Sequence, residues 1–184
     1  MAGRLEGYRI LILETRGEAQ FSRLLQEQGA DVLQCPMFTI HDAPDPAPVE
    51  AWIRLFIDKR FDDLVLMTGE GLRRMMKVAR RIGVDQDFVA AIAKAKRYAR
   101  GPKPVRALRE IGLEANLQTE TPTSEGVAAM LAQQDLKGHR VGLQLYPDKD
   151  HSKLIGAITS YGATVEPVLP YIYDGQAADT NIVE

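Results

Sequence analysis

The stretch DDLVLMTGEGLRRMMKVARRIG, residues 62–83, contains the three parts of one β/α unit. Residues 62–68 are a short and mostly apolar run, which predicts a buried strand. TGEG, residues 68–71, is a turn of small and hydroxyl residues, and the residues after it repeat apolar side chains at helical spacing. A buried strand followed by a tight turn and a helix is the unit of parallel α/β sheets.

The same alternation continues along the chain. Further strands are predicted at residues 8–13, 30–36, 95–101, 114–119, 139–147 and 164–173, and helices at 19–28, about 50–58, 101–112, 124–134 and 152–162. This order predicts the α/β class, with parallel sheets that carry helices on both faces. The ligands of such sheets gather at the carboxyl ends of the strands.

Five strand-to-helix turns lie at those ends, at residues 15–18, 68–71, 101–104, 121–126 and 146–153. Each is rich in small or hydroxyl residues, which let backbone N–H groups approach a ligand, and a helix N-terminus attracts anions. In the fourth turn Thr123 or Ser124 can cap the next helix. An ordinary cap explains one such turn, whereas five together predict the rim of an anion-binding cleft.

Composition indicates an ordinary soluble globular protein, because the 184 residues are 45% hydrophobic and 26% charged. No apolar run approaches the length of a membrane span, and the N-terminal residues lack a signal-peptide core. The single cysteine, Cys35, excludes an internal disulfide, and we expect a cytoplasmic protein. The three histidines, His41, His139 and His151, are scattered, so no metal site is expected.

Positive charge is concentrated in the middle of the chain. Twelve basic and four acidic residues lie from Glu70 to Glu110, a net charge of +8 in a chain of net charge -2. Two interpretations stay open: solvated helix faces, or a basic wall that faces a nucleic acid or a polycarboxylate. Aromatic residues for base stacking are scarce in this segment, which disfavours single-stranded nucleic acid.

Six segments, taken in chain order, resemble the uroporphyrinogen-III synthase family over nearly the whole chain. They begin with the R-ILIL-TR pattern of residues 9–16 and continue with DLVLMTGEGLR (63–73), ARGPKPVRALREIGL (99–113), TPTSEGVAAML (121–131), GHRVGLQLY (138–146) and GATVEPVLPYIY (162–173). The TGEGLR and ARGPKP variants are similar to a branch of the family in which the synthase domain can be fused to a DNA-binding regulatory domain.

The resemblance implies two parallel-sheet β/α domains joined by a two-stranded linker. Domain 1 would comprise residues 1–35 plus 174–184, the linker residues 36–40 and 168–173, and domain 2 residues 41–167. The family continues after Tyr173 with further strands and helices, so domain 1 is expected to be incomplete and to expose apolar surface. Either the chain is a portion of a longer protein, or it is a shortened homologue with altered function.

The resemblance also implies an activity. It is the cofactor-free closure of hydroxymethylbilane, a small-molecule polycarboxylate, to uroporphyrinogen III with ring D inversion and loss of water, in tetrapyrrole (heme) biosynthesis. Tyr171 matches the tyrosine proposed in the family as the acid. The positions carried over to the substrate-binding turns are Thr15, Arg16, Thr68, Gly69, Gly101, Pro102, Lys103, Thr123 and Ser124. Family members more often have a serine at Gly69 and a threonine at Lys103 or Pro104.

For this reading we expect a cytoplasmic monomer with no cofactor, no metal, no membrane contact and no nucleic acid bound by this chain. The alternative is a ligand-sensing or regulatory module of a longer transcription regulator, which needs no turnover. A nucleic-acid binder is a third and weaker reading, and it would need the basic residues on a convex face.

Overall fold

The computed structural model describes residues 3–13, 18–35, 39–59 and 61–174. By its internal contacts the chain divides into two compact units, a smaller one within Met1–His41 and Tyr173–Glu184 and a larger one, Asp42–Ile172. The proposed site residues that the structure describes all lie in the larger unit.

The smaller unit contains two parallel strands, β1 (Arg9–Ile12) and β2 (Asp31–Gln34), and the helix α1 (Glu18–Glu27). Several of its large apolar side chains are about half exposed or more, namely Tyr8, Leu11, Leu13, Phe21, Leu24 and Leu33. The exposed apolar surface that the sequence analysis expects in the first domain is therefore present.

The strands β3 (Thr39–Asp42) and β9 (Tyr171–Asp174) pair with each other in a two-stranded sheet. They overlap the predicted linker segments 36–40 and 168–173, of which residues 36–38 lie outside the described residues. The boundary between the two units falls within both strands. The exact domain limits given above stay a prediction.

The larger unit is built on a five-stranded parallel sheet in the order β6-β5-β4-β7-β8. Its strands are β4 (Asp63–Leu66), β5 (Lys96–Ala99), β6 (Leu117–Gln118), β7 (Arg140–Gln144) and β8 (Thr164–Val168). The chain progresses from β4 to β6 in one direction and then returns to place β7 on the other side of β4. This α/β sheet confirms the predicted fold class, and the point between β4 and β7 is its topological switch point.

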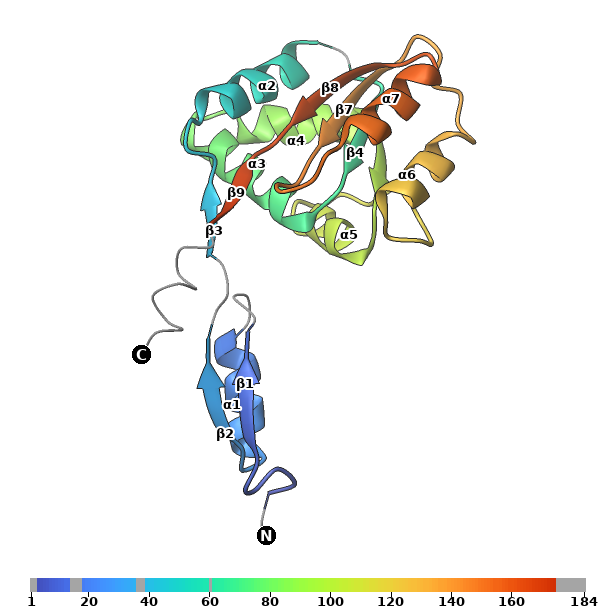
Figure 1. The fold of residues 1–184 in the computed structure, drawn as a ribbon. Coiled ribbons are helices and arrows are strands. Elements are labelled where there is room, and N and C mark those ends of the chain that lie inside the picture. Colours follow the sequence, from blue (N-terminus) through green and yellow to red (C-terminus); the bar gives the residue numbers. More distant parts are fainter. Residues whose placement is uncertain (1–2, 14–17, 36–38, 60, 175–184) are drawn as a thin grey trace. The chain divides into compact units, whose positions relative to one another are not determined.

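Helices cover both faces of this sheet (Figure 1). The helices α2 (Ala47–Asp58), α3 (Gly69–Arg81), α4 (Asp85–Lys94) and α5 (Pro102–Arg109) share one core, and α6 (Ser124–Leu131) and α7 (Ser152–Ser160) share the other. The buried strand β4 serves both cores, because Leu64 and Leu66 belong to the first and Val65 belongs to the second. Alternating side chains of a fully buried strand face opposite sides of the sheet.

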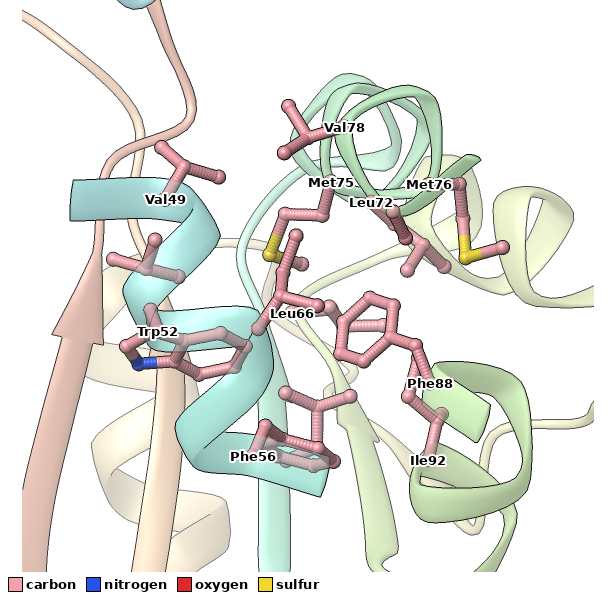
Figure 2. Packing of buried hydrophobic residues seen from close by; sticks show 14 of the residues in the cluster. Val49, Trp52, Phe56, Leu66, Leu72, Met75, Met76, Val78, Phe88 and Ile92 are labelled. Atoms are coloured by element: carbon pink, nitrogen blue, oxygen red, sulfur yellow. The ribbon is translucent and has the colours of Figure 1, made fainter. Parts of the chain in front are cut away.

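An aromatic cluster fills the first core (Figure 2). The Trp52 and Phe56 rings of α2 stack with centroids 5.1 Å apart, and Phe88 of α4 meets Phe56 edge to face at 5.7 Å. Leu66 of β4 lies beneath α2, α3 and α4 in this view. Such packing holds α3 firmly on the sheet, so its first turn has a fixed position at the end of β4.

Three local details differ from the sequence prediction. The helix α4 was not predicted as an element of its own, although Phe88 and Ile92, four residues apart, are both buried. The helix α2 begins at Ala47 rather than near residue 50, with proline in its first turn. The final extended run is two strands, β8 and β9, because Pro170 between them lacks a backbone N–H for a sheet.

Candidate functional site

Four of the five predicted strand-to-helix turns lie in the larger unit. They follow β4, β5, β6 and β7 and precede α3, α5, α6 and α7. Because these strands are parallel, the four turns lie at one edge of the sheet, which we call the carboxyl edge. The fifth turn contains Thr15 and Arg16, and both residues lie outside the described residues.

Two of the predicted threonines are helix caps. The Gly71 N–H donates to Thr68 Oγ1 at 3.0 Å, and the Gly126 N–H donates to Thr123 Oγ1 at the same distance. Thr123 is therefore the cap that the sequence left open, and Ser124 is the first residue of α6. Each cap satisfies one N–H group of its first turn, and the remaining N–H groups stay available at the edge.

The turns before α3 and α5 approach each other closely. A side chain added at Gly69 would place its Cβ 2.4 Å from the Lys103 carbonyl oxygen. Gly101 and Pro102 begin α5, and the Lys103 side chain is exposed. The serine more common in the family at residue 69 would require the α5 turn to move, so Gly69 and the unusual residues of that turn fit each other.

A buried polar cluster lies at the switch point between β4 and β7, and it consists of Thr68, Gln144 and Tyr171. Gln144, the last residue of β7, is fully buried, and its Oε1 accepts the Thr68 N–H at 2.9 Å. The Tyr171 hydroxyl donates to Thr68 Oγ1 at 3.1 Å. Thr68 therefore joins the two strand ends to the tyrosine that the resemblance singles out.

Tyr171 is 1% exposed, so its hydroxyl does not lie at the surface of the larger unit. Its ring belongs to β9, and its contact with Thr68 spans 103 positions of the sequence. The structure thus brings Tyr171, Thr68 and Gly69 together, with Gly101, Pro102 and Lys103 at the adjoining turn.

Gln144 and Gly71 are two residues of this cluster that the sequence analysis did not select. A Cβ at Gly71 would lie 2.0 Å from Gln144 Nε2, so only glycine leaves room for the buried amide. The signal was present in the sequence, since Gln144 is a polar residue at the end of an otherwise apolar strand that follows Val141 and Leu143. A polar residue in that place needs a partner.

The turn after β7 adds an aromatic and cationic group. The Arg100 guanidinium lies over the Tyr146 ring, 4.7 Å from its centroid, and the His151 ring meets Tyr146 edge to face at 4.7 Å. His151 Nε2 lies 2.7 Å from the Tyr146 carbonyl oxygen, which can only accept, so the ring hydrogen is on Nε2. His151 Nδ1 is buried and has no hydrogen-bond partner among the described residues.

Most of the basic segment has a structural explanation. Ion pairs join Arg73 to Glu110, Arg74 to Glu70 and Asp42, Lys77 to Asp42, Arg81 to Glu50, and Arg109 to Glu114. The hydrogen bonds from Lys77 and Arg74 lower the pKa of Asp42 below its usual value. Arg97 donates to three carbonyl oxygens at the end of α4, at 2.6–3.0 Å. These residues form ion-paired helix surface, whereas Arg100 and Lys103 lie at the carboxyl edge.

The part of the chain that the structure describes holds no group of three or more histidine, cysteine, aspartate or glutamate residues placed to bind a metal ion. Across the same residues, none of the helices combines the length and the apolar character needed to cross a membrane. The chemistry of the edge thus depends on backbone N–H groups, hydroxyls, one amide and a few cations.

Comparison with known proteins places this geometry in a family. The model of the family described as uroporphyrinogen-III synthase HemD (HEM4) matches residues 19–184. The chain belongs to the uroporphyrinogen-III synthase family. Its resemblance to that family, stated above from six segments, is thereby confirmed.

Solved structures of the uroporphyrinogen-III synthase from the extremely thermophilic bacterium Thermus thermophilus share the fold. A mutant form of that enzyme is 29% identical with a TM-score of 0.72, over 93% of this chain and 65% of that chain. The wild-type form is 28% identical with a TM-score of 0.60, over the same shares of the two chains. The uncharacterized protein YjjA of Bacillus subtilis (strain 168) is 31% identical over 172 residues, which are 93% of this chain and 63% of that protein. The chain thus spans less than two thirds of these family members.

Proposed function

We propose that this protein is a uroporphyrinogen-III synthase, a lyase that closes hydroxymethylbilane to uroporphyrinogen III with inversion of ring D and loss of water. The observation that carries the proposal is the cluster of Tyr171, Thr68 and Gln144 at the switch point of the sheet. The family match and the Thermus structures support it.

The carboxyl edge suits the charge of this substrate. Hydroxymethylbilane carries eight carboxylates as acetate and propionate side chains. The N-termini of α3, α5, α6 and α7 direct backbone N–H groups and a partial positive charge to one edge, and the exposed Lys103 adds a full charge there. We assign Gly101, Pro102, Lys103, Thr123 and Ser124 to binding of these carboxylates.

The reaction requires few reactive side chains. The electron pair of a pyrrole nitrogen expels the hydroxyl group of the substrate, whose C–O bond breaks as one proton is added to give water. The cationic carbon left behind is attacked by the last ring through a spiro intermediate, and the final ring carbon releases a proton. The protein therefore has to hold the curled chain in a productive pose and to supply one proton near the leaving group.

Tyr171 is our candidate for that proton donor. Its phenol donates its hydrogen to Thr68 in the structure, and the proton released at ring closure can restore it after each turnover. Because the phenol is buried, the neighbouring turns must move when substrate binds. Thr68 then donates its own hydroxyl hydrogen to the phenolate while the Gly71 N–H supports the Thr68 oxygen.

The test is an assay in which freshly made hydroxymethylbilane is supplied to the purified protein and the type I and type III isomers are separated after oxidation. Uncatalysed closure gives isomer I, so isomer III is the readout of the enzyme. We expect predominant isomer III and a loss of kcat of about 10²-fold in Tyr171→Phe. The control is Tyr161→Phe, a half-buried tyrosine at the far end of α7, which should keep full activity.

The burial of Tyr171 also suits the second candidate, a module that binds a tetrapyrrole without turning it over. Isomer I alone from the folded wild-type protein would refute the synthase. Saturable binding of a bilane in the same preparation, weakened by Lys103→Ala, would then favour the sensing module.

A further inference from the structure

Gln144 is a buried polar side chain for which the fold makes special room. It ends β7 and is fully buried. Gly71 in the first turn of α3 has no side chain, and a Cβ there would collide with the Gln144 amide. Glycine inside a helix costs about 1 kcal/mol relative to alanine, so the fold accepts a weaker helix to keep this amide in place.

The orientation of the amide follows from its partners. Its Oε1 faces the Thr68 N–H, which can only donate, and its Nε2 faces the Leu145 carbonyl, which can only accept. A flipped amide would oppose two donors at one end and two acceptors at the other. Gln144 therefore presents an acceptor oxygen to Thr68.

This acceptor determines which way the Thr68 hydroxyl bonds. Oγ1 of Thr68 lies 3.4 Å from Gln144 Oε1, 3.0 Å from the Gly71 nitrogen and 3.1 Å from the Tyr171 hydroxyl. Gly71 donates to it, and Gln144 can only accept from it. The hydroxyl hydrogen is thus drawn toward Gln144, and a lone pair of Oγ1 is left to receive the Tyr171 hydrogen.

We propose that Gln144 is a positioning residue for Tyr171, acting through the backbone and hydroxyl of Thr68. It fixes the first residue before α3 and orients the Thr68 oxygen so that the phenol is held in one direction until substrate takes its proton. This assignment rests on the proposed synthase activity, but its physical core, the coupling of Gln144 to the Tyr171 ring, exists without turnover.

The first test is a double-mutant cycle with Gln144→Met and Tyr171→Phe, read as formation of isomer III. Methionine has a similar length and makes neither hydrogen bond. We expect Gln144→Met alone to lower kcat about 10-fold with KM changed less than about 2-fold, and to change the rate less than about 2-fold in the Tyr171→Phe background. Equal losses in both backgrounds would overturn the proposal. The control is Gln118→Met, an exposed glutamine that ends β6 at the same edge.

A second variant keeps the test decisive if Gln144→Met folds poorly. In Gln144→Glu a protonated carboxyl can still accept from the Thr68 N–H and donate to the Leu145 carbonyl. We expect activity near that of wild type at acidic pH and a progressive loss as the carboxyl ionises against that carbonyl, with the circular dichroism spectrum unchanged. A pH profile identical to that of wild type would contradict a positioning role.

A third readout separates this proposal from the synthase itself. In protein labelled with 13C at tyrosine Cζ, the Tyr171 resonance is identified by its loss in Tyr171→Phe. Gln144→Met should shift it and leave the Tyr161 resonance in place. If the wild type makes no isomer III but this shift occurs, the synthase proposal fails while the coupling holds. If the wild type is active and neither the shift nor the coupling in the cycle is found, the positioning role fails.

Discussion

The two ends of β4 carry two polar clusters of similar composition in different surroundings. At the carboxyl edge Thr68 meets Tyr171 and the neutral amide of Gln144. At the opposite, amino edge the buried Asp63 lies 2.7 Å from His139 Nδ1 and accepts a hydrogen bond from the buried Tyr98.

The difference between these clusters lies in what surrounds them. The carboxyl edge collects the N-termini of four helices, with glycines that let their backbones approach. The amino edge faces helix C-termini, where an anionic substrate is repelled. A buried tyrosine with an acceptor is therefore not by itself a site, and its place in the sheet decides whether an anion can reach it. We assign stability to the Asp63 cluster and function to the Tyr171 cluster.

The largest expected effect is the loss of the Asp63 carboxyl. Asp63→Ala leaves the Tyr98 hydroxyl buried without its acceptor and removes the partner of His139, so the larger unit should lose about 3 kcal/mol of unfolding free energy. Urea unfolding followed by Trp52 fluorescence measures this, because Trp52 is the single tryptophan and lies in the core of that unit.

The same Asp63→Ala protein, below its unfolding midpoint, should still give the wild-type ratio of isomers. Asp135→Ala, an exposed aspartate near the same edge, serves as the control and should cost less than about 0.5 kcal/mol. A change in the isomer ratio without unfolding would break the division of roles between the two clusters.

The next effect is a methyl group placed against Gln144. Gly71→Ala forces the amide to move, so we expect about 2 kcal/mol of destabilisation and at least a 10-fold lower kcat. The matched control is Gly156→Ala in α7, where an added Cβ meets no atom within 4 Å and alanine should be neutral or stabilising. Full activity of Gly71→Ala would mean that the position of the amide is unimportant to the reaction.

The sequence predicted the fold of the larger unit well, because its strands are short apolar runs and each helix follows a marked turn. It missed α4, whose start at Asp85 follows α3 after only a brief glycine turn at Gly83. Local pattern alone had treated that stretch as the end of one helix and the approach to a strand.

The site was less accessible to sequence reasoning. Thr68 and Thr123 were recognisable from their turns, but the contact of Thr68 with Tyr171 joins residues 103 positions apart. Tyr171 was selected through the family resemblance, and Gln144 was not selected at all. The excess of positive charge could not be assigned from the sequence, because ion pairs such as Arg73 with Glu110 depend on how helices pack.

A smaller effect separates the two tyrosines by pH. Burial raises the pKa of Tyr98, and the nearby Asp63 charge raises it further. A tyrosine of the unfolded chain ionises near pH 10, so the contribution of Tyr98 to stability is complete below about pH 10 and is lost as pH rises toward the folded pKa. Tyr98→Phe should therefore cost about 1 kcal/mol at pH 7, and the cost should shrink above pH 10.

Urea unfolding of wild type and Tyr98→Phe at pH 7, 9 and 10.5, again followed by Trp52, measures this difference. Isomer III formation at pH 7 should be the same in both proteins. A constant difference in stability across these pH values would show that the Tyr98 hydroxyl contributes packing alone, and it would weaken the description of the amino edge as a protonated, structural cluster.

The smallest effect concerns the charge at the rim. Lys103 is exposed at the start of α5 and makes no ion pair with the described residues, so it is free to meet a substrate carboxylate. Lys103→Ala should raise KM for hydroxymethylbilane about 3-fold with kcat unchanged, since one exposed charge pair is worth about 0.5–1 kcal/mol. The control is Lys137→Ala, an exposed lysine that precedes β7 at the amino edge, and its KM should stay that of wild type. Added salt should reduce the difference between Lys103→Ala and wild type, because screening weakens the charge that the variant lacks. Equal KM changes in the two lysine variants would mean that the whole surface, and not the carboxyl edge, attracts the substrate, and the contrast between the two ends of β4 would then lose its electrostatic basis.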